Sequence, residues 1–146
     1  MTVYIDTNVF VYAISNRAEL GERARAILRQ VEDSKIDAAT SCMTFSEIVH
    51  VLIKISDRKT AVAAGEGFLA LNNLNIEGMN KTTCRIALET INQSAIRPQD
   101  ALHYATMKEA GITEIITEDS DFDKIKGIRK YSIKEALAKF GKGNRQ

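Results

Sequence analysis

The sequence predicts an α/β protein with three α/β/α layers around a central, mostly parallel sheet. Short apolar runs typical of buried strands alternate with longer segments whose apolar residues recur at helical spacing. The 146 residues include one proline and no internal repeat or low-complexity tract, so we expect a single domain without linkers. Strands separated by helices favour a parallel sheet that is covered on both faces.

The first half of the chain predicts three strands and four helices. The first strand, residues 2–5, is the apolar run TVYI, which stops at Asp6. The second helix is amphipathic, with apolar residues on one face at Leu20, Ala24, Ile27, Leu28 and Val31. In chain order, the elements expected after the first strand are helices 8–15 and 20–33, strand 35–41, helices 45–56 and 58–71, and strand 74–77.

The second half predicts three more helices and two strands. One helix begins at Pro98, a residue favoured at the first helical position, and ends at Gly111. The last helix starts with Ser132 and Glu135 at the spacing of a capping box. In chain order, the expected elements are helices 81–94 and 98–111, strands 113–117 and 128–132, and helix 132–140.

Acidic residues occur at the junctions between these elements. Asp6 follows the first strand, Glu47 and Asp100 lie in what we expect to be first turns of helices, and Asp119 and Asp121 follow the strand TEIIT. In a parallel sheet, ligands bind beyond the carboxyl ends of the strands, where the strand order switches. We therefore expect these carboxylates to gather at one edge of the molecule.

Each acidic residue also has a purely structural interpretation. Asp6 could cap a helix, and Thr44 with Glu47 matches the spacing of a capping box. Asp100 could favour the positive N-terminus of its helix, and Asp119 could form an Asx turn. These interpretations are weaker for the set than for any one residue, because several carboxylates in one cleft repel each other unless a cation lies among them.

The residue types favour a hard cation. Oxygen ligands without Cys or His select Mg²⁺ or Mn²⁺, and Cys42 and Cys84 are too far apart in sequence to suggest a zinc site. Such an ion can lower the pKa of a water that attacks a phosphodiester and can offset charge on the leaving oxygen. Phosphodiester hydrolysis is therefore the chemistry that the acidic set favours.

Four stretches, in this order, resemble the acidic motifs of the PIN-domain nucleases: YIDTNVF, TFSEIVHVL, PQDALHYATM and ITEDSDF. In a single-domain chain of this length they are similar to the VapC toxins of VapBC toxin–antitoxin pairs. The resemblance runs from Tyr4 to at least Phe122. It implies the PIN-like α/β/α fold and a ribonuclease that depends on Mg²⁺ or Mn²⁺.

The resemblance also implies roles for individual residues. The implied catalytic quartet is Asp6, Glu47, Asp100 and Asp119. The implied metal-binding residues are Asp6, Asp100, Asp119 and Asp121. The residues expected to orient the site, its water or the substrate are Thr7, Asn8, Thr117 and His103. His103 and Met107 depart from the usual pattern, which has small or aliphatic residues there, and we expect His103 to be packed beside the site or to contact RNA.

Partners and location are implied in the same way. The family suggests an RNA substrate, a VapB-type antitoxin that blocks the cleft, and a homodimer formed through the early helices. No run of about 18 apolar residues is present, and Asp6 interrupts the N-terminal apolar run, so we expect neither a membrane span nor a signal peptide. A cytoplasmic protein is the expectation.

The charge is divided unevenly along the chain. Residues 124–146 contain eight Lys and Arg against Glu135 alone, a net charge of +7, which leaves −6 on residues 1–123. We expect a nuclease domain at residues 1–140 and a basic, flexible tail at 141–146. The basic segment could attract RNA, or it could be the solvated end of a helix.

Three alternatives remain at this point. A haloacid-dehalogenase-type phosphatase needs a second aspartate two residues after the first, where this chain has Asn8. A receiver domain needs a phospho-accepting aspartate after the third strand, where only Glu77 is present. The third alternative is a PIN-like module that binds RNA without cutting it or that processes RNA, and metal-dependent turnover would distinguish a module that does not cut.

Overall fold

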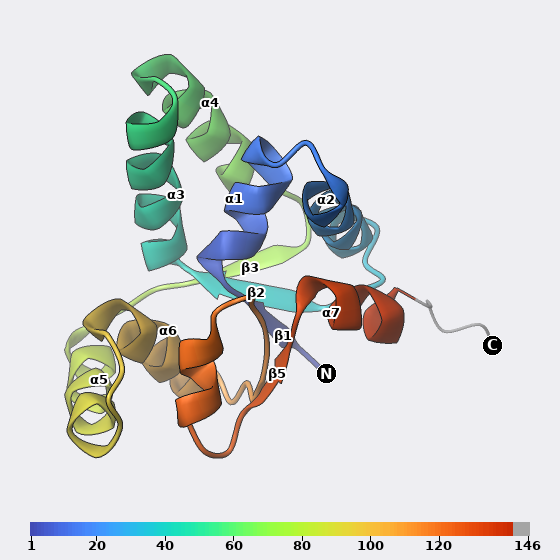
Figure 1. The fold of residues 1–146 in the computed structure, drawn as a ribbon. Helices are drawn as coiled ribbons and strands as arrows, with labels where there is room; N and C mark the ends of the chain where they lie inside the picture. Colours follow the sequence, from blue (N-terminus) through green and yellow to red (C-terminus); the bar gives the residue numbers. More distant parts are fainter. Residues whose placement is uncertain (142–146) are drawn as a thin grey trace.

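The computed structural model describes residues 1–141, which form a five-stranded, all-parallel sheet with helices on both faces (Figure 1). The strand order is β3-β2-β1-β4-β5. The strands are β1 (Val3–Ile5), β2 (Ala38–Ser41), β3 (Leu74–Glu77), β4 (Glu114–Ile116) and β5 (Arg129–Tyr131). The predicted fold class is confirmed.

The helices divide between the two faces of the sheet (Figure 1). On one face lie α1 (Thr7–Ser15), α2 (Glu19–Glu32), α3 (Cys42–Ile55), α4 (Arg58–Leu69) and α7 (Ile133–Phe140). On the other lie α5 (Lys81–Gln93), α6 (Pro98–Glu109) and the 3₁₀ helix η1 (Ser120–Lys124).

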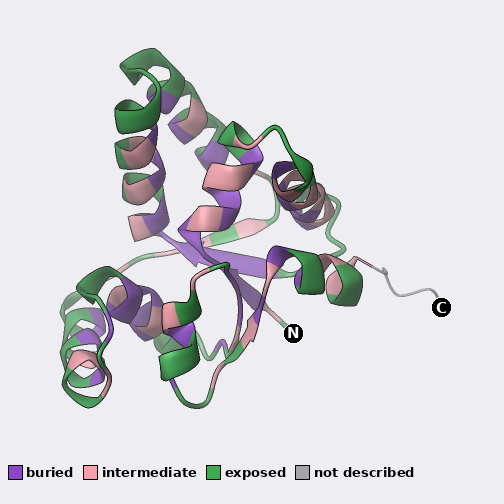
Figure 2. Cartoon of the chain, in the orientation of Figure 1, coloured by how far each residue is buried: buried purple, intermediate pink, exposed green. Residues whose placement is uncertain are grey.

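Each face of the sheet has its own apolar core. Along β1, Val3 and Ile5 point into the first core and Tyr4 points into the second, as the alternation of side chains along a strand requires. Figure 2 shows that β1 and β2 are buried along their length. Burial on both faces explains why β1 reads as a continuous apolar run, whereas β2 also buries the polar side chains of Thr40 and Ser41.

The strand order switches between β1 and β4, and this is where the acidic residues gather. The chain leaves β1 toward β2 and β3 on one side and returns to pair β4 with the other side of β1. The amide of Asp6 donates to the carbonyl of Ile116, 3.1 Å away, so the ends of the two strands are level. The side chains that follow these strands therefore share one crevice.

Several local predictions are confirmed. Pro98 begins α6, Gly111 follows that helix with a positive φ of 71°, and Ser132 and Glu135 form the capping box of α7. The short helix η1 was not predicted, because five residues are too few to show a helical period.

The beginning of α3 is a correction. The helix begins at Cys42, immediately after β2, so Glu47 lies in its second turn and not in the first. The proposed capping box at Thr44 is wrong as well. The Thr44 hydroxyl is 2.7 Å from that of Thr40, and Ser41 is the N-cap residue.

The C-terminal end is described only in part. The boundary expected after residue 140 stays a prediction, and most of the expected tail, including Lys142 and Arg145, lies outside the described residues. Among residues 1–141, no helix is both long enough and apolar enough to cross a membrane.

Two glycines provide a matched test of the packing beside α1. A Cβ added at Gly21 would lie 1.9 Å from the backbone oxygen of Asn16, whereas a Cβ added at Gly67 in α4 meets no atom within 4 Å. We expect Gly21→Ala to lower the free energy of unfolding by about 1–3 kcal/mol, because the α1–α2 connection must shift. Gly67→Ala should raise it by up to about 1 kcal/mol. Chemical denaturation measures both, and equal effects would contradict the close approach at Gly21.

Candidate active site

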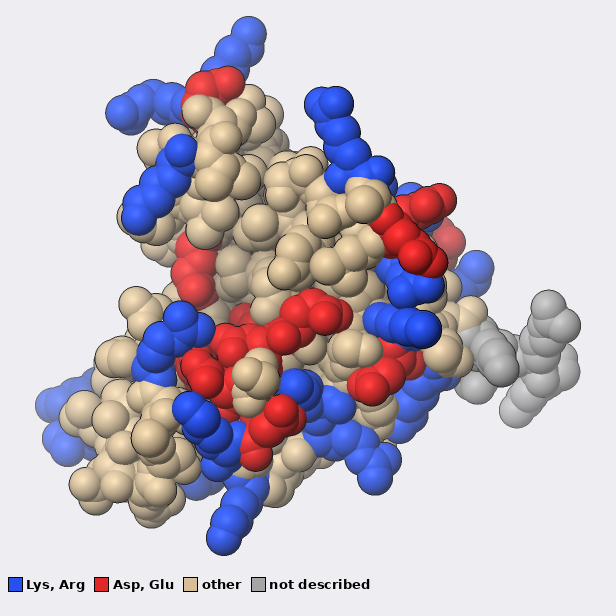
Figure 3. Space-filling view, in the orientation of Figure 1, with Lys and Arg blue, Asp and Glu red and all other residues tan. Residues whose placement is uncertain are grey.

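Five carboxylates converge at the carboxyl edge of the sheet. Asp6 follows β1, Glu47 comes from α3, and Asp100 lies in the first turn of α6. Asp119 and Asp121 come from the segment after β4. Figure 3 shows acidic side chains gathered in a hollow of this face, with basic side chains around it. A pocket whose walls include Asp6, Glu47 and Asp100 opens here.

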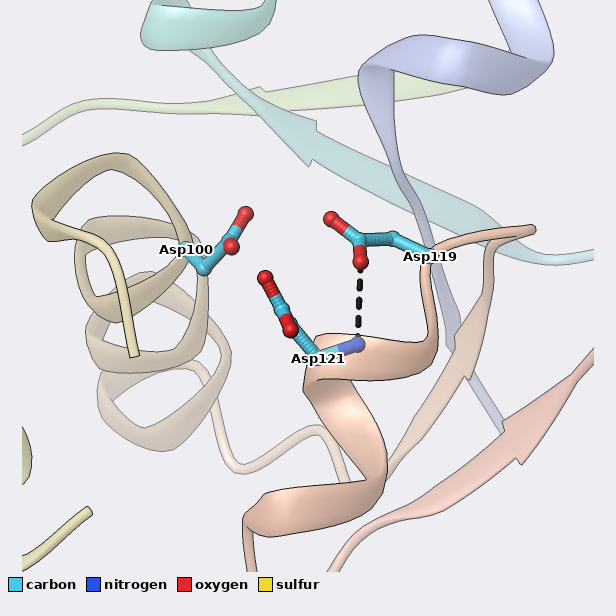
Figure 4. A group of neighbouring side chains, drawn as sticks. All are labelled: Asp100, Asp119 and Asp121. Carbon is cyan, nitrogen blue, oxygen red and sulfur yellow. Dashed lines mark hydrogen bonds between the residues drawn. The ribbon is translucent and has the colours of Figure 1, made fainter. Parts of the chain in front are cut away.

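Three of these carboxylates form an outer group. Ligand oxygens of Asp100, Asp119 and Asp121 all lie within 4.8 Å of one another, and their side chains point toward a common centre (Figure 4). Asp119 also caps η1, because its Oδ1 accepts the amide of Asp121 at 2.9 Å. The expected Asx-type role of Asp119 is therefore real, and it fixes the geometry of the group.

Asp6 lies deeper and is held by hydrogen bonds. It is 5% exposed, and its two oxygens accept the amide of Thr7 at 2.8 Å and the hydroxyl of Thr117 at 2.7 Å. Asn8 donates to Asp6 at 3.2 Å and to the Thr117 hydroxyl at 3.0 Å. Burial raises the pKa of Asp6 above its usual value, against the opposing effects of His103 and the Thr117 hydrogen bond.

Glu47 is held by two side chains. It accepts the Thr7 hydroxyl at 3.0 Å, and its Oε1 lies 2.5 Å from Nε2 of His103. Burial alone would raise the pKa of Glu47, but the hydrogen bond and the charge of His103 outweigh burial and hold this pKa below its usual value. Glu47 is therefore an ionised carboxylate with a fixed orientation.

His103 connects this carboxylate to the core. The ring is 1% exposed, and its Nδ1 lies 2.6 Å from the Tyr4 hydroxyl. Because a carboxylate can only accept, Nε2 carries the proton, and in the neutral ring Nδ1 accepts from Tyr4. Burial acts to lower the pKa of His103, but the hydrogen bond to Glu47 and the charge of Asp6 raise it above its usual value.

Arg97 is a site residue that the sequence analysis missed. Its guanidinium lies 2.9 Å from Asp119, 3.3 Å from Asp100 and 3.5 Å from Asp121, so it touches every member of the outer group. Helical spacing could have predicted the contact with Asp100, because this residue is three positions beyond Arg97. The contacts with the segment after β4 depend on the tertiary fold.

The basic side chains nearby neutralise only part of the negative charge of the outer group. Burial raises the pKa of Asp100 to about 6, and the charge of Asp119 adds to this effect while Arg97 opposes it. Lys124 provides a second cation, 3.1 Å from Asp121. A group of oxygen ligands that still repel each other is suited to a divalent cation with a preference for hard ligands.

The expected metal-binding residues do not all meet. Asp100, Asp119 and Asp121 form one group, whereas the described contacts of Asp6 connect it to Thr7, Asn8, Thr117 and, at 3.7 Å, His103. The residues named from the sequence therefore form an outer group and an inner group. The inner group is Asp6 and Glu47, which His103 and Thr7 both contact.

Comparison with known proteins agrees with this architecture. The family model described as "PIN domain" matches residues 3–128. Among curated proteins, Ribonuclease VapC7 of Mycobacterium tuberculosis is 24% identical over 127 residues, which are 86% of this chain and 88% of the relative.

Two solved structures show how far the fold is shared. VapBC2 from Rickettsia felis, bound to a DNA fragment from its promoter, superposes with a TM-score of 0.71 at 17% identity, covering 90% of this chain and 98% of the other. VapC20 of Mycobacterium tuberculosis, described as a toxin that cleaves the Sarcin-Ricin loop, gives 0.67 at 19% identity, covering 83% and 92%. Because this family model matches residues 3–128, which are most of the chain, the protein belongs to the PIN-domain family.

Proposed function

We propose that the protein is an endoribonuclease that uses Mg²⁺ or Mn²⁺, and that it is the toxin of a toxin–antitoxin pair. The observation that carries this proposal is the convergence of Asp100, Asp119 and Asp121, with ligand oxygens within 4.8 Å of one another, beside the buried Asp6 and Glu47. Such a concentration of negative charge at a strand-order switch is costly unless it serves a cation.

The residues suit this cation by their chemistry. Asp100, Asp119 and Asp121 would hold it, with Asp6 at the back of the same cleft, and all of them offer carboxylate oxygens. A bound Mg²⁺ or Mn²⁺ would supply acidification of the attacking water and neutralisation of charge on the phosphate.

The inner group would orient the reactants. Glu47 is ionised and fixed by Thr7 and His103, so it can accept a hydrogen bond from a water in the cleft and direct it toward a phosphate. Thr117 and Asn8 keep the Asp6 carboxylate aimed into the crevice. These roles correspond to the catalytic and orienting positions that the sequence implies.

The partners follow from the relatives. VapC7 is named a ribonuclease, VapC20 is described as cleaving the Sarcin-Ricin loop, and the Rickettsia felis structure contains a VapBC assembly. We infer an RNA substrate and a VapB-type antitoxin for this chain, and the cytoplasm, where such an RNA is found, as its location. The exposed apolar residues Ile53, Ile55, Val62 and Leu69 on α3 and α4 support an interface for a second copy or for the antitoxin.

The first experiment compares RNA cleavage by the parent protein with that of Asp6→Asn, Asp100→Asn and Asp119→Asn. A mixed tRNA and rRNA pool is incubated with Mn²⁺ or Mg²⁺ and with EDTA. We expect discrete fragments from the parent that vanish with EDTA. The variants should lose about 100-fold or more in rate, because even partners outside the first ligand shell cost about 10–100-fold. The unfolding midpoint of Asp100→Asn should not fall, because the substitution relieves repulsion with Asp119. Circular dichroism checks that Asp6→Asn and Asp119→Asn remain folded.

A matched control is Asp123→Asn. Asp123 belongs to η1 but pairs with Lys130 outside the acidic group, so its removal should leave cleavage unchanged. If an active-site variant cuts at the parent rate, its assignment is wrong. If the folded parent, freed of antitoxin, leaves every RNA intact under all conditions, the result favours a nuclease with a very narrow substrate or a binding module.

A second prediction concerns pH and metal. Since the pKa of Asp100 is about 6 in the fold and lower when unfolded, this carboxyl should make the metal-free protein lose stability as pH rises from about 4 to 6. Asp100→Asn should remove this part of the loss, while the raised pKa of Asp6 contributes a further loss of the same sign. Mn²⁺ should reverse the dependence, because it requires the ionised carboxyl. At pH 8 and a 100-fold excess over its Kd, Mn²⁺ should add about 2.7 kcal/mol.

Thermal unfolding with and without Mn²⁺ at pH 5 and pH 8 measures this. The stabilisation should be large at pH 8 and small at pH 5, and Asp119→Asn should reduce it at both. An unfolding midpoint that Mn²⁺ leaves unchanged at pH 8 would contradict a preformed cation site.

A further inference from the structure

Arg97 occupies an unusual position at the mouth of the site. It is the N-cap residue of α6, but its side chain makes no capping hydrogen bond. The guanidinium reaches instead across to Asp100, Asp119 and Asp121, and contacts the Oδ2 atom of each. Its side chain is nevertheless 66% exposed, so solvent reaches it freely.

We propose that Arg97 takes two partners in turn: the three carboxylates while the site is free of metal, and a phosphate oxygen of the RNA once a divalent cation is bound. This inference rests on the proposed nuclease function and adds a substrate-positioning residue to it. Under this proposal, Arg97 weakens the binding of the metal ion and speeds the cleavage of RNA.

The first step follows from shared carboxylates. The oxygens that converge within 4.8 Å are contributed by the same three carboxylates that Arg97 contacts. A cation within this group would draw on these oxygens and would repel the guanidinium, because both are positive. Arg97 and the metal therefore compete.

The displacement of Arg97 costs little. The Arg97 side chain is 66% exposed, so water screens its ion pairs with the partly exposed Asp119 and Asp121, and screened pairs contribute only about 0–1 kcal/mol each. The other counter-charges of the site are less free to leave. His103 is buried between Tyr4 and Glu47, and Lys124 donates to the backbone oxygen of Ala95 as well as contacting Asp121. Arg97 is thus the counter-charge that the fold allows to move.

The second step follows from the chemistry of the guanidinium. Its planar array of donors matches two oxygens of a phosphate, and such charge-assisted pairs are stronger than neutral hydrogen bonds. Arg97 precedes Pro98 at the start of α6, three residues before Asp100, so its backbone stays beside the cation site when its side chain moves. A phosphate in contact with that cation would lie within reach of the side chain.

The metal part of the test uses calorimetric titration of Mn²⁺ at pH 8, where Asp100 is ionised. We expect Arg97→Gln to bind Mn²⁺ about three- to tenfold more tightly than the parent, because several weak ion pairs no longer compete. Arg97→Lys should lie between the two. Arg85→Gln, on the exposed surface of α5, should match the parent. Lys124→Gln, which removes one contact with one carboxylate, should show a smaller shift than Arg97→Gln.

The RNA part measures cleavage of the tRNA and rRNA pool at saturating Mn²⁺, so that metal affinity no longer limits the rate. We expect Arg97→Gln to cut about tenfold or more slowly, because the glutamine amide lacks the positive charge and the paired donors of the guanidinium. Arg97→Lys should recover part of the rate, and Arg85→Gln all of it.

Tighter Mn²⁺ binding together with slower cleavage supports the proposal, since a merely structural role would weaken both. Unchanged or weaker Mn²⁺ binding by Arg97→Gln overturns the competition. Cleavage at the parent rate overturns the contact with phosphate. Failure of the nuclease function itself is distinguishable, because the parent protein would then neither bind Mn²⁺ nor cut RNA.

Discussion

Repulsion among five carboxylates is the constraint on which the rest of the site depends. The parallel sheet brings the ends of β1 and β4 level, and the helices that follow add Glu47 and Asp100 to the same edge. At these separations, like charges raise each other's pKa or destabilise the fold. Burial raises the pKa of Asp100 to about 6, and the charges of Asp119 and Asp6 add to this effect in the folded protein.

The fold balances this charge in two different ways. The inner carboxylates are compensated by fixed, buried groups: the Thr7 and Thr117 hydroxyls and the His103 ring. The outer carboxylates are compensated by Arg97, which is largely exposed. Burial strengthens an interaction and makes its partners hard to exchange, whereas solvent weakens it and makes exchange easy. This division suits a site in which the inner carboxylates keep a fixed orientation and the outer carboxylates bind a metal ion.

Much of this arrangement could be predicted from the sequence, because buried parallel strands and amphipathic helices have strong local patterns. The acidic residues could be assigned to one edge for the same reason. The beginning of α3 was misplaced because β2 continues into the helix at Cys42 without a glycine or proline, and the N-cap residue Ser41 was assigned to the strand. The contact between Arg97 and Asp119 spans 22 residues, and the contact between Tyr4 and His103 spans 99, so no local pattern could reveal them.

The pairing of Tyr4 with His103 connects the core beneath α6 to the candidate site. Tyr4 points from β1 into the core beneath α6, where its hydroxyl is shielded from water. A buried hydroxyl without a partner costs about 1–3 kcal/mol, so Tyr4 requires a hydrogen-bond partner here. His103 meets that requirement through Nδ1 and leaves Nε2 to bind Glu47. The same ring therefore satisfies the core and orients the site, which links the identity of a strand residue to the position of a proposed catalytic carboxylate.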